Sequence, residues 1–244
     1  MEDQQLKTYH VWDKSVRFFH WINVICVLCL LALGLIILNS GMFGIPNEGK
    51  VLLKELHVIV GYVLALNLLW RVIWGFIGSK YARWSAVLPF KKGLGNDISE
   101  FRQGLSNGKP VHYKGHNPLA RIGISLLFLL LISQTITGLV LAGTDVYYPP
   151  LGNWIAEWIA AEGVNPADLI PYSPDLYDPE AYKEMREFRS PYLWVHLNGF
   201  YALCVLAVIH IAAVIYEENK IGGGMISAMF TGKKALPEKP VDDE

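Results

Sequence analysis

The sequence predicts an all-α integral membrane protein: a four-helix bundle with both termini in the cytoplasm and a long acidic periplasmic loop between helices 3 and 4. Of its 244 residues, 52% are hydrophobic and only 18% are charged, whereas soluble domains carry about a quarter charged residues. The hydrophobic residues form four blocks, each long enough to cross a bilayer. A net charge of −1 provides no basic field for nucleic acid, so the sequence excludes a nucleic-acid partner.

The four blocks define one membrane domain over residues 16–216, between an arm at 1–15 and a tail at 217–244. The third block includes 21 consecutive residues without a charge, and the fourth has no acidic or basic side chain except two histidines. Such runs favour transmembrane helices over buried helices of a soluble core. We expect the spans at about residues 16–38, 51–77, 119–142 and 192–216.

The charges of the connecting segments orient these spans. Lysine and arginine gather in the arm, in the loop at 78–120 and in the tail, whereas the loop at 143–191 has nine acids and three bases. The positive-inside rule therefore places the basic segments in the cytoplasm and the loop 143–191 in the periplasm. We expect a multi-pass protein of the bacterial inner membrane, in contact with membrane lipid.

Four histidines lie in or at the ends of the spans, where ionisable side chains are costly and usually functional. The predicted topology places His20 and His210 near the cytoplasmic surface, and His57 and His196 near the periplasmic surface. His196 and His210 are 14 residues apart, so they share a helix face and differ in height by about 21 Å. Two macrocycles stacked along the fourth span would each receive one of these imidazoles. Because two axial histidines suit electron transfer, the cofactor that fits is haem b, bound twice.

Neighbouring residues add weaker signals for haem. Gly61 and Gly199 share a face with a histidine on their own spans, and Gly34 lies at the height of the periplasmic pair, where a porphyrin edge needs room. Close helix packing would explain these glycines equally well. Arg71 and Arg17 lie at the height of the cytoplasmic pair and suit a haem propionate, although snorkelling to lipid phosphate is the alternative.

Two further patterns carry less weight. His112 and His116 lie in a loop rich in glycine, asparagine and lysine, and we interpret them as an exposed pair. In the acidic loop, residues 154–159 repeat tryptophan and isoleucine on one helical face, which predicts a short helix at the membrane interface. A loop that packs on top of the bundle is the alternative.

The ordered set of motifs resembles the prokaryotic cytochrome b561 family, which includes the di-haem cytochrome b subunits of nickel–iron hydrogenases. The resemblance rests on RFFHW at Arg17–Trp21, HVIVGY at His57–Tyr62, and the pair His196 and His210, and it covers about residues 8–233. It implies that His20 and His210 ligate the iron of one haem, and that His57 and His196 ligate the other. It also implies electron transfer between a periplasmic redox protein and quinone.

We therefore expect the electron-transfer subunit of a membrane oxidoreductase complex, supplying a quinone reductase or quinol oxidase half-reaction. Its partner at 143–191 would be a hydrogenase, a multihaem cytochrome c or another oxidoreductase, and a homo-oligomer stays open. One alternative is a stand-alone superoxide:quinone oxidoreductase, and another is a haem-free structural anchor. Cations that would attract superoxide are Lys50, Lys54, Arg186 and Arg189. Candidates for the quinone site are Arg17, Trp21, Asn23 and Gln134.

Overall fold

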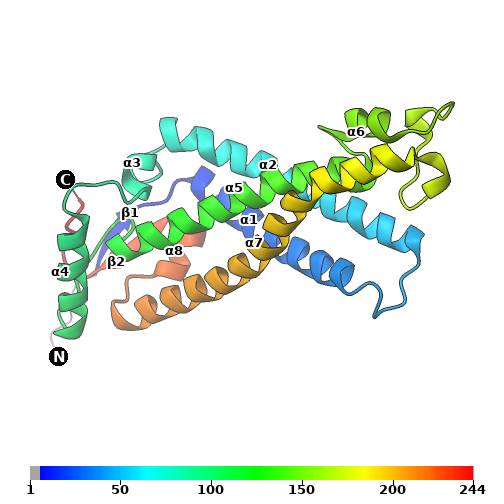
Figure 1. Ribbon diagram of the computed structural model, residues 1–244. Helices are drawn as coiled ribbons and strands as arrows, with labels where there is room; N and C mark the ends of the chain where they lie inside the picture. The colour runs from blue at the N-terminus through cyan, green and yellow to red at the C-terminus, as the bar shows by residue number, and fades with distance from the viewer. Residues whose placement is uncertain (1–5, 244) are drawn as a thin grey trace. The chain divides into compact units, whose positions relative to one another are not determined.

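Helices dominate the computed structural model, which describes residues 6–243 (Figure 1). Four of them have 25, 31, 29 and 42 residues and are apolar enough to cross a membrane, where about 20 residues suffice. They are α1 (Lys14–Leu38), α2 (Asn47–Ile77), α5 (Pro118–Val146) and α7 (Pro179–Lys220). The four expected membrane-length helices are thus confirmed. Of the predicted arm and tail, residues 1–5 and 244 lie outside the described part of the chain.

The fourth helix is longer than the sequence suggested. The apolar run predicts a start at residue 192, but α7 begins at Pro179 and continues through Pro191. Proline is well tolerated at the first helical position because its missing N–H would have no helical partner there. The first turns of α7 carry charges every few residues, so a search for apolar spans stops short of them. The acidic segment between α5 and α7 therefore covers only residues 147–178.

The chain divides into two compact units, which we describe separately. The terminal unit contains the described residues of Met1–Ile22, Leu68–Leu129 and Leu203–Glu244. The loop unit contains Asn23–Asn67 and Leu130–Ala202. The division places His20 and His210 in one unit, and His57 and His196 in the other.

In the terminal unit, the arm and the tail pair with each other. Strand β1 (Lys7–His10) runs antiparallel to β2 (Lys233–Leu236), with Lys7 opposite Leu236. Tyr9, Trp12 and Val16 pack with side chains from the α2–α3 connection and from the tail to form a small core. The shorter helices of this unit are α3 (Trp84–Val87), α4 (Leu94–Ser106) and α8 (Met225–Thr231).

In the loop unit, the segment between α5 and α7 folds into a cap with its own core. It contains α6 (Gly152–Ile159) and two 3₁₀ turns, η1 (Pro166–Asp168) and η2 (Pro174–Leu176). Ile155 and Ile159 are fully buried with Met185 of α7. Trp154 stays half exposed, so the short helix predicted at residues 154–159 exists and packs through its isoleucines.

One buried carboxylate joins three helices of the loop unit. Asp145 near the end of α5 lies 2.8 Å from the Lys54 ammonium of α2, and Arg189 of α7 donates two hydrogen bonds to the same carboxylate. The three side chains are only 13–19% exposed. The group is therefore a structural ion triad, and two of the four cations considered for superoxide are already paired.

Candidate functional site

The loop unit brings His57 of α2 and His196 of α7 together. Their ring centroids are 6.3 Å apart, with ring planes inclined by 68°. A metal–imidazole bond is about 2.0–2.1 Å long, and a five-membered ring with bonds of about 1.35 Å has its nitrogen roughly 1.15 Å from the centroid. Two imidazoles on opposite sides of one metal ion therefore have centroids about 6.4 Å apart. The observed spacing fits a pair of axial ligands without any movement of the helices.

His196 is anchored by α5. Its Nδ1 lies 2.9 Å from the hydroxyl of Thr137, and its backbone carbonyl accepts a hydrogen bond of 3.0 Å from the Gln134 amide. Gly138 lies beside the same ring, because a Cβ at that position would come within 3.3 Å of His196 Cε1. Sequence reasoning missed Thr137 and Gly138, although the segment QTITG at residues 134–138 interrupts an otherwise apolar run.

His57 has a different environment. Its Nδ1 is buried and has no hydrogen-bond partner among residues 6–243. A Cβ at Gly34 would lie 3.6 Å from its Cε1, so Gly34 does lie against this histidine. The two other glycines that the sequence singled out differ: no atom lies within 4 Å of a Cβ at Gly61, whereas the Gln134 side chain fills the space beside Gly199.

The terminal unit contains the second histidine pair. His20 of α1 and His210 of α7 are close enough to interact electrostatically. The buried Nδ1 of His20 has no hydrogen-bond partner within the described chain, and its ring packs edge-on against Trp21 with centroids 5.3 Å apart. The donor set therefore matches that of the loop unit, with two imidazoles from two helices.

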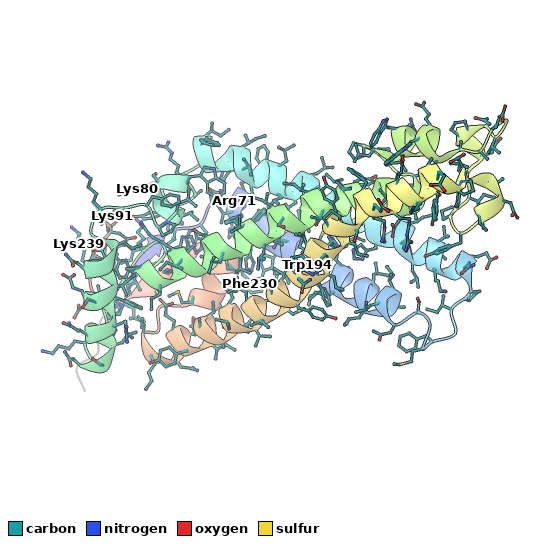
Figure 2. All side chains as sticks on the ribbon, in the orientation of Figure 1. Arg71, Lys80, Lys91, Trp194, Phe230 and Lys239 are labelled. Carbon is teal, nitrogen blue, oxygen red and sulfur yellow. The ribbon has the colours of Figure 1, made fainter. Side chains whose placement is uncertain are left out.

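Arg71 of α2 is a buried residue of the terminal unit and is labelled in Figure 2. Its side chain is 4% exposed and lies over the rings of Trp84, Phe128 and Phe19 at 4.8, 5.3 and 5.9 Å. One terminal nitrogen donates to the carbonyl of Ala82 at 2.9 Å, whereas Nη1 is buried without a partner in the described chain. A guanidinium in this position does not snorkel to lipid, and its remaining N–H groups suit a carboxylate.

The other polar candidates are largely engaged in backbone hydrogen bonds. Arg17 donates to the carbonyl of Phe230, and Trp21 donates to that of Met229 at 3.0 Å. Both carbonyls belong to the last turn of α8, where no helical N–H is available for them. Arg17 Nε and Asn23 Oδ1 are buried without partners in the part of the chain described. Arg17 and Trp21 therefore stabilise the end of α8, and Trp21 also contacts the ring of His20.

The prediction of an exposed pair at His112 and His116 is wrong. His112 is 7% exposed, and the Nδ1 atoms of both rings are buried. The ring of His116 packs on Trp12 with centroids 4.7 Å apart. Burial, together with neighbouring cations such as Lys234 and Arg71, lowers the pKa of His116 to about 3, so it is neutral at pH 7. The fold of the arm and tail over this loop was not visible in local composition.

Lys234 is a second buried ionisable group and interacts electrostatically with His116. Lys234 of β2 is 3% exposed and donates to the carbonyls of Gly115 at 3.0 Å and Tyr113 at 3.3 Å. Burial lowers the pKa of Lys234 to about 8, although Glu217 opposes the shift. The Glu217 carboxylate in turn accepts a hydrogen bond of 2.8 Å from Asn117.

The donors in both units fit haem better than a bare ion. No group of three or more histidine, cysteine or acidic side chains converges within residues 6–243. A protein-bound zinc ion needs three or four such ligands, whereas a porphyrin provides four nitrogens itself and leaves two axial positions for imidazoles. Paired histidines, an orphaned imidazole nitrogen and a buried guanidinium together suit a macrocycle with carboxylate side chains.

Comparison with known proteins agrees with this chemistry. A family model described as prokaryotic cytochrome b561 matches residues 11–232. The "Probable Ni/Fe-hydrogenase B-type cytochrome subunit" of Rhizobium leguminosarum bv. viciae is 26% identical over 252 residues, covering 96% of this chain and 91% of that protein. The "Probable Ni/Fe-hydrogenase 1 B-type cytochrome subunit" of Escherichia coli (strain K12) is 27% identical over 238 residues, with 93% and 91% covered. No solved structure matches the chain.

Proposed function

Because the chain belongs to the prokaryotic cytochrome b561 family, we propose that it is a di-haem b-type cytochrome subunit of a bacterial inner membrane. In this proposal it transfers electrons between a periplasmic Ni/Fe hydrogenase and the membrane quinone pool. Family membership itself implies a b-type haem and a multi-pass membrane protein. The observation that carries the proposal further is the 6.3 Å separation of the His57 and His196 rings.

The two histidine pairs would hold the two haems, His57 with His196 and His20 with His210. A haem b bound by two imidazoles supplies reversible one-electron transfer, with no open position for oxygen chemistry. The residues around it orient the ligands and exclude water. Arg71, with one buried N–H group unpartnered in the described chain, would pair with a propionate of the haem at the terminal-unit site.

The proposed partner is supported by the relatives and by the loop. The two relatives described above are named as hydrogenase cytochrome subunits, and this chain covers 91% of each. Residues 143–191 have nine acids and three bases, and the cap has its own core. A preformed acidic surface steers a basic partner without an ordering cost. We therefore place the hydrogenase on this segment.

We place the quinone headgroup in the terminal unit. A cavity of about 210 Å³ is lined there by the α2–α3 connection, by α3 with Ser85, by the loop before α5 with His116, by α5 with Arg121, and by Asp242 of the tail. His116 also interacts electrostatically with His210, so the cavity lies close to one histidine pair. The Arg121 guanidinium and the Ser85 hydroxyl can donate to quinone carbonyls. Reduction takes up two electrons and two protons per quinone, and the exposed rim of the cavity supplies the protons.

The two alternative functions, a stand-alone superoxide:quinone oxidoreductase and a haem-free structural anchor, receive less support. A superoxide oxidoreductase would need free cations at the loop-unit site, but Lys54 and Arg189 are paired with Asp145. A haem-free anchor gives no reason for half-buried imidazoles at ligand spacing. Rapid mixing of the purified chain with superoxide tests the first alternative, since haem reduction faster than in buffer would favour it.

The proposal is tested by hydrogen-driven quinone reduction in membranes that express the chain with a Ni/Fe hydrogenase. We expect His210→Ala to abolish the reaction and His10→Ala to leave it intact, because His10 is exposed on β1. Quinone reduction that continues at the full rate without this chain would overturn the proposal.

A further inference from the structure

The tautomer of His196 is determined by its contact with α5. We infer that Thr137 is a positioning residue, which fixes the proton of His196 on Nδ1 and thereby presents Nε2 to the iron. The inference rests on the proposed haem at the loop-unit site. It assigns a role in that site to a residue that does not itself touch the metal.

The hydroxyl of Thr137 has one proton and three neighbours. Its Oγ1 lies 2.7 Å from the carbonyl oxygen of Ser133 and 3.3 Å from that of Gln134, besides 2.9 Å from His196 Nδ1. A carbonyl oxygen can only accept, and two oxygens 2.7 Å apart without a proton between them repel each other. The hydroxyl therefore donates to Ser133, the usual back-bond of a helical threonine.

The position of the proton on His196 follows from the direction of the hydrogen bond between Thr137 and Ser133. With its only proton directed at Ser133, the Thr137 oxygen offers a lone pair to Nδ1, so Nδ1 must be the donor. A neutral imidazole has one N–H and one lone pair, and the lone pair is then on Nε2. Nε2 is consequently the nitrogen available to a metal.

The rest of the α5 face holds the ring in this orientation. Gln134, one turn before Thr137, donates to the backbone carbonyl of His196, and the absence of a side chain at Gly199 leaves room for that amide. Gly138 leaves room for the ring itself, since a Cβ there would lie 3.3 Å from Cε1. One turn of α5 thus fixes the backbone, the proton and the tilt of His196.

The arrangement makes the two ligands of this site unequal. The buried Nδ1 of His57 has no partner in the described chain, whereas Nδ1–H of His196 donates to an oxygen. A hydrogen bond from the outer nitrogen of a metal-bound histidine increases the basicity of the ligand. A more basic ligand stabilises ferric over ferrous iron, so Thr137 should lower the reduction potential of this haem.

The test compares Thr137→Val with Thr137→Ser and with a control on the same helix, Thr135→Val. Thr135 makes the same kind of back-bond, at 2.9 Å to the carbonyl of Leu131. Haem content, both midpoint potentials and the ferric electron paramagnetic resonance spectrum are measured on purified protein in detergent.

We expect Thr137→Val to retain two haems and to shift one potential upward. The ferric-to-ferrous ratio of that haem at fixed potential should fall severalfold, where a tenfold change corresponds to 59 mV for one electron. Thr137→Ser should restore the original potential and spectrum, and Thr135→Val should change neither. If Thr137→Val loses a haem, the test depends on Thr137→Ser. The inference requires that this variant retain both haems at their original potentials.

Two results would overturn the inference. One is a valine variant with both haems at unchanged potentials, and the other is an equal shift in Thr135→Val. Failure of the proposed function looks different, since the unmodified chain would then bind fewer than two haems.

Discussion

The ion triad of the loop unit allows a stability prediction with a worked magnitude. Asp145→Asn removes the carboxylate that Lys54 and Arg189 share and leaves two cations with 13–19% exposure unpaired. Removing one partner of a buried pair costs about 3–5 kcal/mol. Because these side chains retain some contact with solvent, we take the lower end, about 3 kcal/mol. In a chain of this size 1 kcal/mol shifts Tm by about 2–4 °C, so we expect a loss of about 6–12 °C.

The assay is thermal unfolding in detergent, followed by circular dichroism, with Asp97→Asn as the matched control. Asp97 pairs with Lys91 at 3.5 Å on the surface, where the side chains are 32% and 63% exposed. Such pairs contribute about 0–1 kcal/mol, so the control should lose at most about 4 °C. A Tm for Asp145→Asn within the range of the control would refute the account of the triad.

Three further predictions concern the two histidine sites and the buried lysine. Gly138→Ala should reduce the haem content toward one per chain, because the added Cβ would lie 3.3 Å from the imidazole of His196. The control Gly123→Ala on the same helix should retain both haems, because no atom lies within 4 Å of its added Cβ. Equal haem contents in the two variants would contradict the prediction. Arg71→Gln should lower one midpoint potential in a redox titration, because a buried positive charge favours the added electron; two unchanged potentials would remove Arg71 from the site. Lys234 has a pKa of about 8 when folded against a reference of 10.5, so between these values the unfolded chain binds more protons and stability rises with pH, by up to about 1.4 kcal/mol per unit. In denaturation experiments at pH 8–10, the Lys234→Met variant should lose this increase of stability with pH. The control Lys233→Met, at an exposed position, should retain it. The same dependence of stability on pH in both variants would refute the lowered pKa of Lys234.

Much of the architecture was predictable because a bilayer imposes simple rules. Length and hydropathy identified all four membrane-length helices. The structure brings His57 to His196 within one unit, and His20 to His210 within the other. The pairing predicted from height along the spans agrees with these contacts, since four spans that alternate in direction leave few ways to combine four histidines.

The failures have a common physical origin in contacts between distant segments. The polar start of α7 at Pro179 gains its stability from the cap, in which Met185 is buried, rather than from lipid. His116 is covered because the arm supplies Trp12 and the tail supplies Lys234. Neither local composition nor the hydrophobic period reports such long-range packing.

The roles of single polar side chains could not be predicted from the sequence either. Gln134 was a candidate for quinone, yet its amide holds the backbone of His196. The sequence gives no signal for Thr137, since a threonine in a membrane helix usually donates its hydroxyl proton to a carbonyl of the preceding turn. Only the distance to Nδ1 of His196 reveals its second contact.

The central claim is that two pairs of imidazoles each hold one b-type haem, and a reduced-minus-oxidised spectrum with haem quantified per chain tests it most directly. The account predicts two haems in the unmodified chain, one in His57→Ala, one in His20→Ala, and two in the control His10→Ala. A count other than two in the unmodified chain, or full haem content in both ligand variants, would contradict it.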